Sequence, residues 1–179
     1  MKPAYSPDTF AHIDFDTIMS EVPWVQRTEA RKECFQSGIP MDYTYGSGRG
    51  VRTYSSVPYT PTVQAVLDFL NHYGEYNVCF LNLYEDKKQH LGWHADDSPS
   101  MDHNHAIAVV SFGEPRYIWW RRKGTKGVVP EEQRQLLAHG SLFIMPPGMQ
   151  KDWEHRIPKH DREAGPRISL TFRRWIPVG

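Results

Sequence analysis

The stretch RISLTFR, residues 167–173, decides the fold, because its polar and apolar residues alternate. Successive side chains of a β-strand point to opposite faces of a sheet. One face therefore carries the apolar side chains that can pack in a core, namely Ile168, Leu170 and Phe172. The other face carries the polar side chains, namely Arg167, Ser169, Thr171 and Arg173. That polar face either lies in water, as in many amphipathic strands, or lines the mouth of a barrel.

Segments of similar character precede this one in the second half of the chain. They are short, apolar or aromatic, and punctuated by turn residues: YNVCFLNLY (76–84), HAIAVVSFG (105–113), RYIWWRRKGTKG (116–127) and GSLFIMPPG (140–148). Such runs predict strands. Residues 1–75 instead predict a part made of helices and loops. Helices are expected in FDTIMSEVPW (15–24) and TPTVQAVLDFLNHYG (60–74), and turns in the Gly-, Ser- and Tyr-rich segment 41–61.

These patterns predict one domain over residues 1–179, mainly β with flanking helices (α+β), built as a β-sandwich or jelly roll. The formal net charge is zero, with 21 basic and 21 acidic residues. A protein that coats nucleic acid is usually basic, so nucleic acid could be held here only by a local patch. Cys34 and Cys79 are too few for a disulfide framework. A cytoplasmic protein is expected, or a nuclear one in a eukaryote, with no membrane partner.

Metal-ligating residue types concentrate in LGWHADDSPSMDHNHA (91–106). His94 and Asp96 are two residues apart, so in an extended segment both project to one side and can grip one cation. The pair alone is weak evidence, because ADDSPS also has the composition of a polar turn. His155 in DWEHRIP offers a third ligand. Two histidines and one carboxylate suit an Fe(II) oxygenase, although catalytic zinc accepts similar ligands.

Arginine pairs with a carboxylate through two parallel hydrogen bonds. A dicarboxylic oxoacid that chelates iron at one end would need such a partner at its far end, and the polar face of RISLTFR supplies two candidates. Asn82 and Tyr84 are two residues apart on an expected strand and share a face. They could line the same cavity, or they could form the polar face of an edge strand.

Taken together, these pieces resemble the AlkB family of Fe(II)- and 2-oxoglutarate-dependent dioxygenases. The matching motifs are LNLY, WHADD, SFGEPR, HGSLFIM, DWEHRIPK and PRISLTFR, in order and over most of the chain. The resemblance implies a double-stranded β-helix (jelly roll) in which His94, Asp96 and His155 hold Fe(II). It also implies a set of residues that hold the cosubstrate 2-oxoglutarate, with Arg167 at its far carboxylate and Arg173 near its chelating end: Asn82, Tyr84, Arg167, Ser169 and Arg173.

The resemblance further implies oxidative dealkylation of N-alkylated bases in DNA or RNA with O2, releasing succinate, CO2 and an aldehyde. A monomer acting on single strands is expected. A base needs a flat neighbour, for which Tyr54 is the first candidate and Tyr45 the second. Asp97 could read the base, and Arg122 in the basic hairpin 121–126 could meet phosphates or simply be solvated. The chain looks closest to the eukaryotic-style nucleic-acid demethylase branch of the family, whose repair members usually carry an acidic residue where this chain has Ser98, and this leaves the identity of the base open.

Two other functions fit the same residues. The chain could be a related hydroxylase that acts on a protein, a small molecule or an unalkylated base. It could also be a catalytically silent jelly-roll binding module, although the complete set of metal ligands and arginines argues against this. Iron binding with succinate release separates an enzyme from a module, and a substrate panel separates the two enzymes. The remaining histidines of the segment, His90, His103 and His105, are expected to be solvated.

Overall fold

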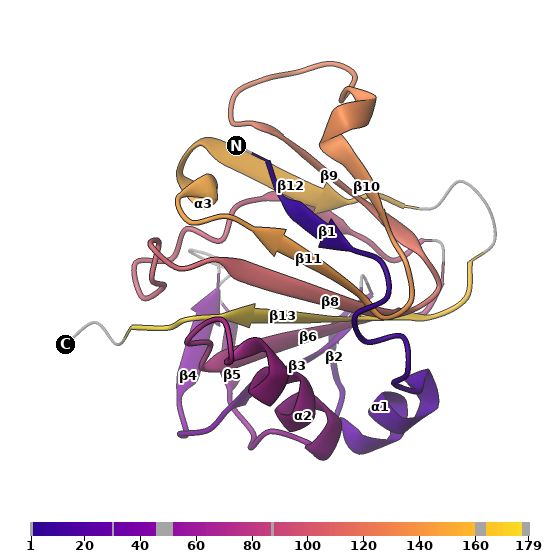
Figure 1. Ribbon diagram of the computed structural model, residues 1–179, viewed down its shortest axis with the longest axis vertical. Coiled ribbons are helices and arrows are strands. Elements are labelled where there is room, and N and C mark those ends of the chain that lie inside the picture. The colour runs from indigo at the N-terminus through magenta and orange to yellow at the C-terminus, as the bar shows by residue number, and fades with distance from the viewer. Residues whose placement is uncertain (1, 30, 46–51, 87, 160–163, 177–179) are drawn as a thin grey trace.

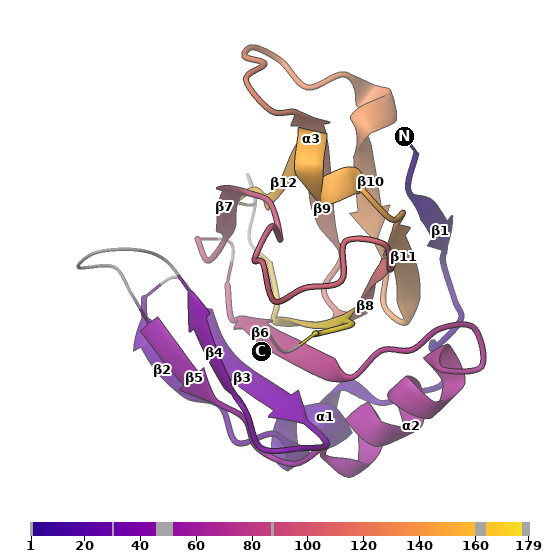
Figure 2. The same ribbon diagram turned by 90° about the vertical axis from the view of Figure 1, so that its left-hand side faces the viewer.

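The structure is a computed structural model that describes residues 2–29, 31–45, 52–86, 88–159 and 164–176. Two antiparallel sheets face each other as a jelly roll (Figures 1 and 2). The larger sheet has the strand order β1-β11-β8-β13-β6-β3-β2, and the smaller one β10-β9-β12-β7. The strands of the larger sheet are β1 (Ala4–Ser6), β2 (Val25–Thr28), β3 (Arg31–Ser37), β6 (Val78–Tyr84), β8 (Ile107–Gly113), β11 (Ser141–Met145) and β13 (Arg167–Arg173).

The smaller sheet holds β7 (Leu91–His94), β9 (Arg116–Arg122), β10 (Arg134–Leu137) and β12 (Trp153–Ile157), and a short 3-10 turn (Glu131–Gln133) precedes β10. A separate hairpin is formed by β4 (Asp42–Tyr45) and β5 (Arg52–Ser55). The helices are α1 (Phe15–Glu21), α2 (Pro61–Leu70) and α3 (Met149–Asp152). No helix in these described parts is long and apolar enough to cross a membrane.

The stretch RISLTFR is β13, a central strand that pairs with β6 on one side and β8 on the other. Its apolar residues join the core layer beneath α1 and α2, the two helices that cover the outer face of the larger sheet in Figures 1 and 2: Ile168, Leu170 and Phe172. The polar residues therefore point to the opposite face, toward the smaller sheet. This confirms the second reading of the strand, in which both arginines lie inside the barrel.

The two helices form where the sequence places them. The prediction for 60–74 rested on apolar residues at helical spacing, and these are the buried residues of α2: Val63, Val66, Leu67 and Leu70. Thr60 precedes the helix and Pro61 begins it, where a missing backbone N–H costs nothing. A second apolar layer lies between the sheets and contains Val109 of β8, Trp120 of β9 and Phe143 of β11. This second layer packs the two sheets against each other, whereas the first packs the larger sheet against the helices.

The expectation that residues 1–75 form helices and loops is incomplete, because five strands lie there. Segment 41–61, predicted as turns, contains the β4–β5 hairpin, in which Tyr43 pairs with Tyr54. The strand β3, RKECFQS, reads as polar because its inward face carries Arg31 and Glu33, which line a cavity rather than a core. Apolar alternation is therefore weak in this strand. The segment is held as a strand by its pairing with β6, which runs from Lys32 to Ser37, although its composition does not predict a strand.

Arg116, from the motif SFGEPR, is a buried cation with a structural role. Its guanidinium donates to the backbone carbonyls of Asp86 (3.4 Å), Gln89 (2.8 Å) and Pro158 (2.7 Å), so it ties the chain before β7 to the chain after β12. We expect Arg116→Met to lower the free energy of unfolding by about 3 kcal/mol, because hydrogen bonds to a charged group are worth about 1.5–3 kcal/mol and the carbonyls lose their partner.

Urea titration measures this loss. The matched control is Arg122→Met, which removes an exposed arginine from the same strand and should change the unfolding free energy by less than about 1 kcal/mol. Equal losses in the two variants would contradict the structural role of Arg116.

Candidate active site

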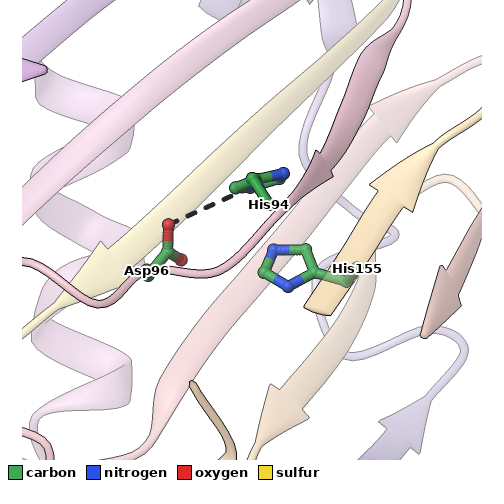
Figure 3. A group of neighbouring side chains, drawn as sticks. All are labelled: His94, Asp96 and His155. Atoms are coloured by element: carbon green, nitrogen blue, oxygen red, sulfur yellow. Dashed lines mark ion pairs between the residues drawn. The ribbon is translucent and has the colours of Figure 1, made fainter. Parts of the chain in front are cut away.

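Three potential metal ligands meet between the sheets (Figure 3). His94 ends β7, Asp96 lies two residues further in the following loop, and His155 lies in β12. The register of the smaller sheet pairs His155 directly with His94, which brings the two imidazole centroids to 4.2 Å. One ligand atom from each residue lies within 4.8 Å of the others. The structure therefore brings together the three ligands that the sequence predicts.

The surroundings put two of these ligands in a metal-binding protonation state. Burial raises the pKa of Asp96, but Arg173 and the two histidines outweigh burial and lower that pKa to about 2. Arg173 Nη2 lies 2.9 Å from Asp96 Oδ2. Burial and His94 lower the pKa of His155 to about 3. At neutral pH the site thus offers an ionised carboxylate and a neutral imidazole, the forms that bind metal ions.

Neighbouring groups also orient the ligands. The His94 Nδ1 atom lies 2.8 Å from the carbonyl oxygen of Gly92, and its Nε2 lies 4.0 Å from Asp96 Oδ1. The backbone N–H of Asp96 donates to Gln150 Oε1 at 2.9 Å. His155 Nδ1 is buried with no hydrogen-bond partner. Partners such as the Gly92 carbonyl and Gln150 hold the rings and carboxylates of metal sites in position. Two nitrogens and one oxygen are ligands that suit Fe(II), so the three residues fit the ion that the sequence predicts.

An inner cavity between the two sheets is lined on one side by the triad. Its polar lining includes every residue that the sequence assigns to the cosubstrate: Asn82, Tyr84, Arg167, Ser169 and Arg173. Apolar side chains from both sheets close the cavity, among them Val109, Ile118 and Met145. The alternative of a polar edge strand for Asn82 and Tyr84 does not hold, because β6 lies between β13 and β3.

Arg167 is the anion-seeking group of this inner cavity. Its side chain is 1% exposed, and its Nη2 donates to Ser111 Oγ at 2.9 Å. Its Nε and Nη1 atoms have no hydrogen-bond partner, and no carboxylate in the described chain forms an ion pair with it. Burial lowers the pKa of Arg167 to about 10, so the guanidinium stays charged at neutral pH. A buried cation with two free donors needs an anion, and a carboxylate matches its geometry.

An outer cavity opens on the other side of His94 and Asp96, toward the hairpin. Aromatic side chains form its wall: Tyr43, Tyr54 and Phe80. Tyr54 is only 5% exposed, meets Phe80 edge-on at 5.3 Å, and has the Arg27 guanidinium 4.6 Å above its ring centre. Its role in stacking stays a prediction. Tyr45 ends β4, and its side chain lies outside the described residues.

The other expected substrate residues lie further out. Asp97 is exposed at the rim of a groove that also contains Tyr43 and Ser98, and it forms an ion pair with Lys123 at 3.5 Å. Arg122 is exposed on β9, with its guanidinium 5.3 Å from the Trp153 ring centre, and it lines neither cavity at the triad. The site thus includes Asp97 at its edge and leaves Arg122 outside.

Several lining residues were missed by sequence reasoning. Tyr43 lines both the outer cavity and the adjoining groove, and Arg31 and Glu33 line the cavity from β3. A period of two in RKECFQS would have placed Arg31, Glu33 and Phe35 on one face, had that segment been read as a strand. Gln150 follows the GSLFIMPPG strand and carried no signal of its own.

The comparisons with known proteins agree with this geometry. Residues 4–173 match the family model described as the 2OG-Fe(II) oxygenase superfamily. The "Alpha-ketoglutarate-dependent dioxygenase alkB homolog 3" of Bos taurus is 35% identical over 184 residues, covering 91% of this chain and 61% of that protein. The "DNA oxidative demethylase ALKBH2" of Homo sapiens is 30% identical over 176 residues, covering 90% and 67%.

The chain spans about three fifths of the length of the alkB homolog 3 relatives. A solved structure of OsALKBH1 has the same fold, with a TM-score of 0.58 and 16% identity over 96% of this chain and 97% of that one. The match over residues 4–173, the identities over nine tenths of the chain and the assembled triad lead to one conclusion. The chain belongs to the 2OG-Fe(II) oxygenase superfamily, among the AlkB homologues.

Proposed function

We propose that this chain is an Fe(II)- and 2-oxoglutarate-dependent dioxygenase that removes alkyl groups from N-alkylated bases in DNA or RNA. The observation that carries the proposal is the pairing of two sites in one barrel. The triad of metal ligands and the buried Arg167, which has two donors without a partner, line the same cavity. A metal-chelating dicarboxylate satisfies both at once. The names of the relatives, a dioxygenase and a DNA oxidative demethylase, support the same activity.

The residues of the chain divide the work of binding and orientation. His94, Asp96 and His155 would hold the iron, which supplies the activation of O2 and the oxidation of the alkyl carbon when bound. Arg167 would hold the far carboxylate of 2-oxoglutarate, with Ser169, Asn82 and Tyr84 along the same inner face. Arg173 keeps Asp96 ionised and in place through their 2.9 Å ion pair. The overall reaction converts 2-oxoglutarate to succinate and CO2, and the hydroxylated alkyl group leaves the base nitrogen as an aldehyde.

The outer cavity supports a flat substrate. Its wall is aromatic, and it opens onto His94 and Asp96, so a ring between these walls would present its alkyl group to the metal. Bases that undergo chemistry are taken out of the stack and held by aromatic side chains and hydrogen bonds. Tyr54 with Tyr43 would supply the stacking, and Asp97 would contact the substrate at the rim. A monomer is proposed, because one chain contains every residue of both cavities.

The substrate should be single-stranded. A protein with zero formal charge has little electrostatic binding energy to offset the cost of pulling a base from a duplex. Mass spectrometry of methylated oligonucleotides, incubated with the protein, Fe(II), 2-oxoglutarate and O2, tests this. We expect methyl loss from single strands, slower loss from duplexes, and none with His155→Ala as the matched inactive control.

A second outcome would favour the alternative function. If methylated oligonucleotides of every kind stay intact while the wild-type protein consumes 2-oxoglutarate, the metal and cosubstrate sites stand and the nucleic-acid substrate is wrong. A hydroxylase of a protein, a small molecule or an unalkylated base would then lead, and the serine at position 98 would be the first residue to examine.

A further inference from the structure

The outer face of the smaller sheet takes no part in the two cavities at the triad. In β9, Ile118 and Trp120 are buried in the apolar layer between the sheets. The alternation of a strand therefore turns Tyr117, Trp119 and Arg121 outward. A groove of about 810 Å³ lies on this outer face, and Tyr117 and Trp119 are part of its lining. The groove is larger than either cavity at the triad, so the face has room for an extended ligand.

Arginine and tryptophan side chains alternate across this face. The register of the sheet places Arg134 of β10 and Arg156 of β12 on either side of Trp119. Their guanidinium carbons lie 4.8 and 5.7 Å from the Trp119 ring centre. Arg156 also lies 5.7 Å from the ring centre of Trp93 in β7, and Arg121 lies 3.9 Å from that same centre. The row therefore crosses all four strands, which at about 4.8 Å between neighbours is a width of roughly 15 Å.

Two arginines of this row carry a charge that no carboxylate neutralises. Arg121 forms an ion pair with Glu154 at 2.7 Å. In the part of the chain that the structure describes, neither Arg134 nor Arg156 forms an ion pair: Arg134 donates to the carbonyl oxygen of Val129, and Arg156 Nε has no hydrogen-bond partner. A guanidinium stacked on a ring keeps N–H donors at its edge, where phosphate oxygens can accept from them.

The chemistry of the face fits a single strand of nucleic acid. Such strands are held by aromatic side chains that stack on the bases and by basic side chains that bind the phosphates. Tyr117 adds a ring that is 44% exposed. The groove lining also contains one lysine and one glutamate, Lys159 and Glu131, so the two unpaired arginines leave the face positive. A protein with zero formal charge needs a local patch of this kind to hold a polyanion.

The strand β7 connects this face to the triad, because it is the edge strand of the smaller sheet. His94 and Trp93 are consecutive residues of β7, so His94 points inward to the triad while Trp93 points outward to the row. A single strand that leaves the outer cavity beside His94 needs only to pass around β7 to reach Trp93. We propose that the outer face of the smaller sheet is a second binding site for the nucleic-acid substrate, which holds the strand that continues from the reacting nucleotide. The inference rests on the proposed function and adds to it a site outside both cavities.

The test compares two methylated single strands of different length. A trinucleotide methylated at its middle base has one nucleotide on each side and should not span the face. A strand of about 15 nucleotides, near the upper end of known single-strand site sizes, should cover both sites. The double variant Arg134→Gln with Arg156→Gln removes the two unpaired charges. Its kcat/KM should fall by about tenfold or more for the long strand and stay unchanged for the trinucleotide.

Binding gives a second readout that does not depend on catalysis. Fluorescence anisotropy with a labelled, unmethylated long strand measures Kd at several salt concentrations. Each lost phosphate contact should lower the slope of log Kd against log salt by about 0.7, so the double variant should lose about 1.4. Lys32→Gln with Lys151→Gln is the matched control, because it removes the same charge from β3 and α3, outside the face and both cavities. Its slope and its kcat/KM should equal the wild-type values.

If the double variant does not fold, Arg156→Gln alone replaces it, with an expected change in slope of about 0.7. An unchanged Kd and slope would overturn the inference and leave the face to a protein partner. An equal loss of kcat/KM for both lengths would also overturn it, because the arginines would then serve the fold of the barrel. Failure of the proposed function is distinct: the wild-type protein would demethylate neither strand while still consuming 2-oxoglutarate.

Discussion

Replacing His155 with alanine is expected to abolish succinate production and to reduce the iron content of the purified protein. His155 is buried in β12 and supplies one of the three ligands found among the described residues, so His94 and Asp96 alone hold the ion less well. Loss of a residue that merely orients a ligand costs about 10–100-fold in metal affinity or activity. Loss of the ligand itself should therefore cost at least about 100-fold. Succinate release by mass spectrometry and iron by atomic emission measure the two effects.

His103→Ala is the matched control for this variant. His103 comes from the same histidine-rich segment as His94, but its ring is exposed, contacts the carbonyl of Ser98 and lies outside the ligand group. Iron content and turnover should stay near the wild-type values. A His155→Ala protein that keeps full turnover, or a control that loses iron equally, would mean that the triad is not the metal site.

The sequence predicted the inner half of the site better than the outer half, and the reason is distance along the chain. His94 and Asp96 are neighbours in one extended segment, and the two arginines share one strand, so the period of a strand is enough to align each pair. His155 and His94 lie on different strands, but their residue types mark both as possible metal ligands. The inner cavity is made of residues whose chemistry is unusual in a core.

The outer cavity depends on contacts that no local pattern shows. Its wall joins Phe80 of β6 and Glu33 of β3, which pair within the larger sheet, to Tyr43 of the separate hairpin, whose ring packs against Phe80. The polar face of β3 hides the alternation that marks a strand, so the sequence predicts turns and loops in this region. Tyr54 shows the same limit, because its type fits stacking while its burial under Arg27 follows from packing alone.

Arg167→Lys tests the remaining half of the inner site. Arg167 offers two buried donors without a hydrogen-bond partner, Nε and Nη1, in the lining of the inner cavity. A lysine keeps the positive charge but presents a single ammonium group, so it cannot form two parallel hydrogen bonds with one carboxylate. The charge is retained, and only the geometry of carboxylate recognition is lost.

We expect the apparent KM for 2-oxoglutarate to rise by about 10–100-fold, because one charge-assisted hydrogen bond contributes about 1.5–3 kcal/mol and each 1.4 kcal/mol is tenfold. The KM for the oligonucleotide should change by less than about threefold, since Arg167 lines the inner cavity and does not line the outer one. Arg122→Lys, on the exposed end of β9, should leave both constants unchanged. An unaltered dependence on 2-oxoglutarate in Arg167→Lys would assign the two free donors to another anion. Equal rises in both constants would instead indicate that the barrel itself has been distorted.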